Sequence, residues 1–187
     1  IVRAKRLLAE RKVPFEVPRL QELAPRLRSV LDVVYLVFNE GYTASSGEDW
    51  TRPALCEEAL RLCRVLTGLM PSTVSVLGLL ALMELQASRL RARVAADGSA
   101  VLLLDQDRSR WDWLQIARGQ AALDQAMTLG GADDAYVLQA GIAACHARAR
   151  QAEQTDWQAI ADLYARLAEV MPSPVVELNR VVAVAQV

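Results

Sequence analysis

Apolar residues recur every three or four positions along most of this chain, which is the spacing of one face of an α-helix. Leu27, Val30, Leu31, Val34 and Phe38 form the first clear stripe. The stretch over residues 73–89 is apolar on nearly all sides, so we expect a central, buried helix there. The pattern predicts further helices over residues 52–69, 109–129, 134–148, 156–170 and 174–187.

Two interruptions organise this helical pattern. Residues 13–18 read VPFEVP, and two prolines four positions apart favour an extended linker. It divides the end of a basic helix over residues 1–12 from a helical domain over residues 19–187. Farther along, Asp97-Gly98 is a strong turn signal between two apolar runs, so we expect a small hairpin or extended loop over residues 90–104.

An internal similarity at a spacing of 101 residues suggests a repeat. Three tetratricopeptide periods of about 34 residues give nearly this spacing. We therefore predict an all-α fold, an array of antiparallel helix pairs that is tetratricopeptide-like. The alternative is that any two amphipathic hairpins joined at proline look alike. Leu62, Leu66, the MPS at 70–72, Val74 and Leu77 match Leu163, Leu167, the MPS at 171–173, Val175 and Leu178.

Composition narrows the classes of function. The net charge is −1 and 53% of the residues are hydrophobic, so a real core is expected without an overall bias toward nucleic acid or membrane. The most apolar run, residues 74–85, is shorter than the roughly 20 residues of a membrane span. Three cysteines without a C-x-x-C pair favour a reducing, cytoplasmic compartment and no disulfide.

Catalytic apparatus is not visible in the sequence. His146 is the single histidine, and the chain has neither a glycine-rich phosphate loop nor a nucleophile elbow. We therefore expect no enzyme activity, no metal and no cofactor. The competing hypothesis is acid–base catalysis by paired carboxylates, such as Asp105 and Asp107 with Glu40.

Polar residues gather in three clusters at predicted helix ends. Each cluster alone fits a helix cap. The residues of interest are Asn39, Glu40 and Tyr42 in the first cluster, Asp105, Asp107, Arg108, Arg110 and Trp111 in the second, and Glu177, Asn179 and Arg180 in the third.

Arginine within apolar sequence suggests that the three clusters act together. A buried arginine needs a partner, and Arg108 and Arg180 each lie within a stretch of largely apolar sequence. We expect acids of the same clusters to supply carboxylates to them. The clusters would then meet across the stack, where they either fix its register or line a concave binding surface.

The same three clusters resemble a known family. LVFNEGYTASSG at 36–47, LDQDRSRWD at 104–112 and PSPVVELNR at 172–180 are similar to the C-terminal extension of a group of bacterial extracytoplasmic-function (ECF) RNA polymerase sigma factors. IVRAKRLLAE at 1–10, followed by residues 13–18, resembles the junction after sigma region 4. The chain starts inside a helical pattern at Ile1, and we expect a fragment of a longer protein.

The resemblance implies a regulatory, protein-interaction domain of a factor for promoter-specific transcription initiation. Its partners would be core RNA polymerase and the sigma core of its own chain. Promoter DNA would be reached only through N-terminal regions outside this chain, while Arg3, Lys5 and Arg6 would at most contact phosphate. The oligomeric state stays open. The alternative is a generic helical-repeat scaffold that binds a peptide or small protein.

Overall fold

The computed structural model describes residues 6–7, 10–11, 20–44 and 50–187. The predicted linker at 13–18, Arg3 and Lys5 lie outside the described residues. The chain divides into two compact units, residues 1–30 and residues 31–187. Each unit is described by itself.

The first unit contains the beginning of helix α2, Leu20–Tyr42. Its described ion pairs are local and exposed. Arg6 pairs with Glu10 at 2.8 Å, and Arg26 pairs with Glu22 at 3.3 Å, each across one helical turn. Exposed pairs of this kind contribute little to stability.

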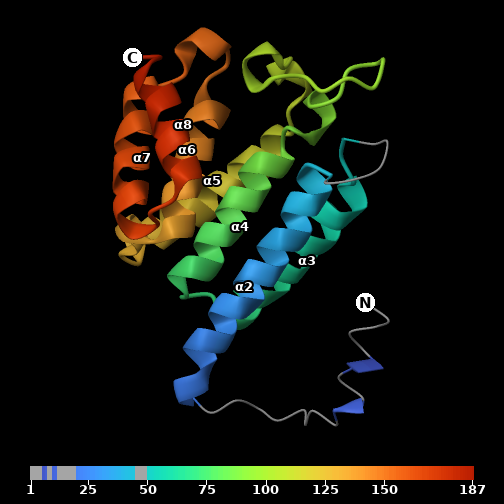
Figure 1. The fold of residues 1–187 in the computed structure, drawn as a ribbon, viewed down its shortest axis with the longest axis vertical. Helices are drawn as coiled ribbons and strands as arrows, with labels where there is room; N and C mark the ends of the chain where they lie inside the picture. Colours follow the sequence, from blue (N-terminus) through green and yellow to red (C-terminus); the bar gives the residue numbers. More distant parts are fainter. Residues whose placement is uncertain (1–5, 8–9, 12–19, 45–49) are drawn as a thin grey trace. The chain divides into compact units, whose positions relative to one another are not determined.

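The second unit is a set of antiparallel helix pairs around a central helix (Figure 1). The central helix α4 packs against α3, α5 and α6, and α7 packs against both α6 and α8. The expected all-α fold with packed helix pairs is confirmed. After the end of α2, the α-helices are α3 Pro53–Leu69, α4 Val74–Ala87, α5 Trp113–Thr128, α6 Ala135–Arg148, α7 Trp157–Val170 and α8 Pro174–Val184.

Helix α4 is buried on nearly all sides, as its sequence predicts. Small residues allow its neighbours to come close. A side chain added at Gly78 would lie 2.9 Å from the backbone nitrogen of Val137 on α6. The one acidic side chain of α4, Glu84, is 2% exposed and accepts an ion pair from Arg64 on α3 at 2.6 Å.

The segment between α4 and α5 is built from turns. A single antiparallel bridge joins Val94 and Ala100, and Gly98 lies in the left-handed region at φ 85°. Within the described part of the chain this bridge stands alone and no strand forms. The segment expected as a hairpin or extended loop over residues 90–104 therefore begins with a 3-10 turn, Leu90–Ala92, and continues with the bridged turn around Gly98. It leads into a second 3-10 turn, Leu103–Asp105, and a third, Arg108–Arg110, follows it.

Helices α3 and α7 end with similar geometry before the connections to α4 and α8. Met70 ends α3 with φ −135° and ψ 59°, and Met171 ends α7 with φ −139° and ψ 71°. Their amides donate to the carbonyls of Leu66 and Leu167 at 2.9 and 2.8 Å. The sequence similarity at an offset of 101 residues therefore corresponds to two similar helical hairpins.

No helix in the described ranges is both long enough and apolar enough to cross a bilayer.

Candidate functional site

Three arginines gather where the end of α2 meets the turns after α4. The Arg89 guanidinium lies 5.9 Å from the ring centres of both Tyr42 and Trp111. Arg93 lies 3.7 Å above the Tyr42 ring, and Arg108 lies 4.8 Å from the Trp111 ring. We call Arg89, Arg93 and Arg108 the arginine cluster. Aromatic faces attract these cations, so the cluster joins the first and second polar segments of the sequence.

Arg108 is 6% exposed and binds carbonyl oxygens instead of a carboxylate. Its Nη1 donates to the carbonyls of His146 and Ala149 at 2.8 and 2.7 Å, and its Nη2 donates to Thr155 Oγ1 at 3.4 Å. The prediction that an acidic side chain pairs with Arg108 was therefore wrong. The last carbonyls of α6 lack partners within the helix and lie at its negative end, so they can stabilise a guanidinium.

Arg180 does not reach the other clusters either. It is partly exposed and pairs with Glu177 of its own helix, three positions earlier, at 2.5 Å. Because residues three apart lie on one helix face, this pair forms without any tertiary contact. The expectation that Arg180 finds a carboxylate across the stack was therefore wrong.

Of the remaining predicted acids, Glu40 and Asp107 accept from nearby described residues. Glu40 accepts an ion pair from Arg52 at 2.8 Å. Asp107 accepts from the backbone amide and hydroxyl of Ser109 at 2.9 and 2.6 Å, and these bonds lower the pKa of the Asp107 carboxyl. Asp105 and Arg110 are exposed.

A polar cavity of about 410 Å³ lies beside the arginine cluster, among α2, α4, α6, α7 and α8. We call it the Arg89 cavity. Arg89 and Gln86 line it from the end of α4, and Asn179 of the third polar segment lines it from α8. Tyr35 of α2, which directly precedes the first polar segment, also lines the cavity. Burial raises the pKa of Tyr35, whereas its side-chain hydrogen bonds with Asn39 and Gln86 act in the opposite direction.

His146 lines the same cavity from α6. Its ring meets Trp157 edge-on, with 5.3 Å between ring centres. Burial, and then the charges of Arg89 and Arg108, lower the pKa of His146 to about 4. The ring is therefore neutral near pH 7, and its buried Nδ1 has no hydrogen-bond partner among the described residues.

Arg89 and Gln86 were not singled out from the sequence. The available signal was their position: they are polar residues three apart, at the end of the apolar run that forms α4. Such a pair lies on one face of a helix. Which neighbours that face meets depends on Tyr42, Trp111 and His146, which come from distant parts of the chain.

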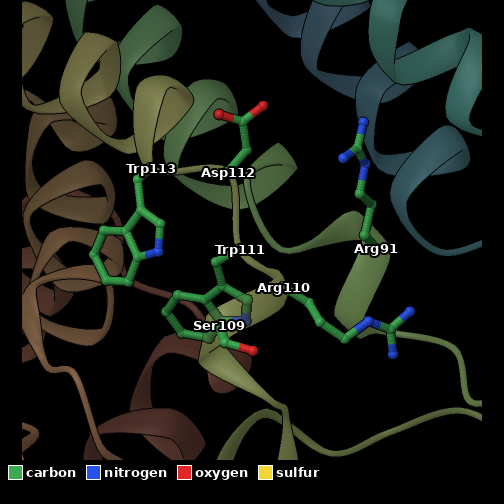
Figure 2. A pocket seen from close by; sticks show the side chains of 6 residues that line it. All are labelled: Arg91, Ser109, Arg110, Trp111, Asp112 and Trp113. Atoms are coloured by element: carbon green, nitrogen blue, oxygen red, sulfur yellow. The ribbon is translucent and has the colours of Figure 1, made fainter.

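A second depression, of about 700 Å³, opens at the surface beside the start of α5 (Figure 2). Figure 2 shows the indole rings of Trp111 and Trp113 on one side and the guanidinium groups of Arg91 and Arg110 on the other. Asp112 caps α5 by accepting from the Gln115 amide at 2.9 Å. This surface presents exposed cations beside the turns that Arg108 fixes.

In the ranges that the structure describes, no group of three or more histidine, cysteine, aspartate or glutamate side chains is arranged to hold a metal ion.

The fold and the site define an all-α domain of paired helices with a partly buried arginine cluster beside the turns that follow α4. The chain belongs to a family described as a family of unknown function (DUF6596), whose model matches residues 26–127. An uncharacterized protein of Rhizobium meliloti (strain 1021) is 48% identical over 186 residues, covering 100% of this chain and 44% of that protein. The chain thus spans less than half of this relative. No solved structure matches it.

Proposed function

We propose that this chain is the C-terminal regulatory and protein-interaction domain of a bacterial ECF sigma factor, acting in promoter-specific transcription initiation. One observation carries the proposal. The three segments that resemble the sigma-factor extension surround one centre: Arg89 contacts Tyr42 and Trp111 and shares a cavity with Asn179. Segments that define a family by sequence and meet in space are expected to serve one role.

The repeat geometry supports a tetratricopeptide-like architecture within this proposal. Helices α3 and α7 end alike at Met70 and Met171, 101 residues apart, and the α5–α6 pair occupies the interval between the two hairpins. Stacked helix pairs present extended surfaces that bind other proteins. Such a domain is suited to contact core RNA polymerase or the sigma core of its own chain.

The relative from Rhizobium meliloti supports a domain within a longer protein. The matched region accounts for 44% of it, so more than half of that protein lies outside the match. Under our proposal, the regions that melt and read the promoter belong to such additional sequence.

Regulation by the domain requires different contacts in an active and an inactive state. The surface beside Trp113, with the exposed Arg91 and Arg110, is our candidate for these contacts. Arg108 ties the adjoining turns to α6 through the carbonyls of His146 and Ala149, so this surface is held in one conformation.

The decisive experiment is transcription by the full-length factor with and without residues 19–187. We expect the deletion to change promoter-dependent transcript levels in a reconstituted assay with core polymerase. A double variant of the surface arginines, R91A/R110A, is expected to change transcription while the protein keeps its melting temperature. R118A, at another exposed position on α5, is the matched control. Unchanged activity and promoter choice after deletion would refute the proposal.

Two assays with the 187-residue chain separate the competing functions. A gel shift at moderate salt is expected to show no promoter-specific binding, and specific binding would contradict the domain assignment. A pull-down against purified sigma core, core polymerase and unrelated proteins tests the scaffold alternative. Capture of unrelated proteins alone would favour a generic scaffold.

A further inference from the structure

The Arg89 side chain is half-buried and has neither an ion pair nor a hydrogen bond among the residues that the structure describes. Its neighbours are two aromatic rings and the cations Arg93 and Arg108. Burial lowers the pKa of Arg89, but an arginine stays protonated in a protein. A partner of opposite sign stabilises a partly desolvated charge, and the described residues around this cation supply none.

The cavity in front of Arg89 offers space for that complement. Its volume of about 410 Å³ falls within the range of small-molecule sites. Among the described residues that line it, none is acidic. The cavity therefore has a positive end and supplies no anion of its own.

Further unpartnered atoms define what else an occupant would carry. Gln86 Oε1 and His146 Nδ1 are buried and have no hydrogen-bond partner in the described part of the chain. Gln86 Oε1 only accepts, so its complement is a donor. The neighbouring cations disfavour an ammonium group, so a neutral donor such as a hydroxyl fits this position. Leu82, Ile142 and Leu167 add apolar wall for a short carbon skeleton.

We infer that the Arg89 cavity binds a small hydroxycarboxylate, with its carboxylate on the Arg89 guanidinium and its hydroxyl near Gln86. A planar guanidinium matches a carboxylate through two parallel hydrogen bonds. Asn179 and Tyr35 line the same space, so an occupant would touch α2 and the third polar segment at once. This inference goes beyond the proposed role in transcription and does not depend on it.

The test measures ligand-dependent melting of the 187-residue chain, followed by calorimetric titration, at constant ionic strength. The probes are glycolate, lactate and 3-hydroxybutyrate, with butyrate, chloride and inorganic phosphate as comparisons. At least one hydroxycarboxylate is expected to raise the melting temperature by a few degrees over chloride. Butyrate is expected to bind about tenfold more weakly than 3-hydroxybutyrate, because it leaves Gln86 Oε1 unpaired.

Two variants locate the site. R89M is expected to weaken binding at least about tenfold, while R110M removes the same charge from the surface and keeps the response. Q86E places a carboxylate inside the cavity, so it is expected to raise the melting temperature and abolish the response. Q86E also decides the matter if R89M does not fold. The inference is overturned if chloride or phosphate acts as strongly as every hydroxycarboxylate, or if R89M and Q86E respond like the original chain.

Discussion

Arg108 is buried and Arg89 is half-buried, and these two arginines of one cluster differ in the partners that their guanidinium groups find. Arg108 donates to two carbonyls and one hydroxyl from the end of α6 and beyond it. Arg89 meets only aromatic faces and other cations among the described residues. An arginine thus fixes the local structure at position 108, whereas the arginine at position 89 keeps hydrogen-bond donors that a ligand can use.

The difference lies in what the surrounding backbone offers. Arg108 reaches the C-terminal end of a helix, where carbonyls need donors. Arg89 extends from the end of α4 toward a cavity whose walls are side chains. Burial alone therefore does not reveal the role of an arginine. Its role depends on which hydrogen-bond acceptors lie within its reach.

The largest effect is expected from removing Arg108. R108A leaves the His146 and Ala149 carbonyls without their donor, and we expect a loss of about 2–4 kcal/mol in the free energy of unfolding. Urea denaturation followed by circular dichroism measures it. R110A, two residues away and exposed, is the control and should change little. Equal effects of both variants would contradict a structural role for Arg108.

The next largest effect is expected from lowering the pH, which should reduce the stability of the folded protein through His146. The pKa of His146 is lowered to about 4 in the folded protein, below the ordinary value of 6.5. The unfolded chain therefore binds a proton first, and stability falls as the pH drops from about 6.5 to 4, by on the order of 2 kcal/mol. The groups facing this ring are Arg89, Arg108 and Trp157.

The H146Q variant checks this source of acid sensitivity. Its unfolding free energy, measured across the same pH range, should have a shallower slope than that of the original chain. An unchanged slope would assign the acid sensitivity to the carboxylates instead.

A smaller loss of unfolding free energy is expected when Thr155 is changed, and this variant tests one hydrogen bond of Arg108 by itself. Its hydroxyl is buried and accepts a long hydrogen bond of 3.4 Å from Arg108. T155V keeps the shape and removes the acceptor, at a cost of about 1 kcal/mol. T155S keeps the hydroxyl and serves as the control. Coupling with R108A in a double-mutant cycle should account for most of the loss.

The smallest effect is expected for Arg89, despite its partial burial. R89M removes a charge that has no described partner and keeps a long apolar side chain, so stability should stay within about 1 kcal/mol or rise. Urea denaturation in ligand-free buffer measures this. A loss as large as that of R108A would place Arg89 among the structural residues and erase the contrast.

Local structure could be predicted from the sequence because its causes are local. The buried α4 and the hairpins that end at Met70 and Met171 follow from periodicity and proline. The start of α5 was expected at residue 109 but lies at Trp113. Asp107 caps a separate short turn, and Asp112 then caps the helix itself.

The candidate site depends on contacts that no local pattern encodes. The acceptors of Arg108 lie 38, 41 and 47 positions away along the chain. A sequence in which Arg108 is surrounded by aspartates suggests a carboxylate partner, although those carboxylates cap nearby turns. Arg89 becomes notable only when Tyr42 and Trp111 enclose it.

The buried cysteines make the chain a convenient subject for spectroscopic labelling. All three thiols are free and buried, and burial raises the pKa of Cys56 to about 11 and of Cys63 to about 12, with Cys145 also raised. Thiol reagents react with the thiolate form, so these three cysteines react slowly at neutral pH. One cysteine introduced at exposed Arg110 would then carry a single fluorophore, whose signal reports partner docking without removing any native thiol.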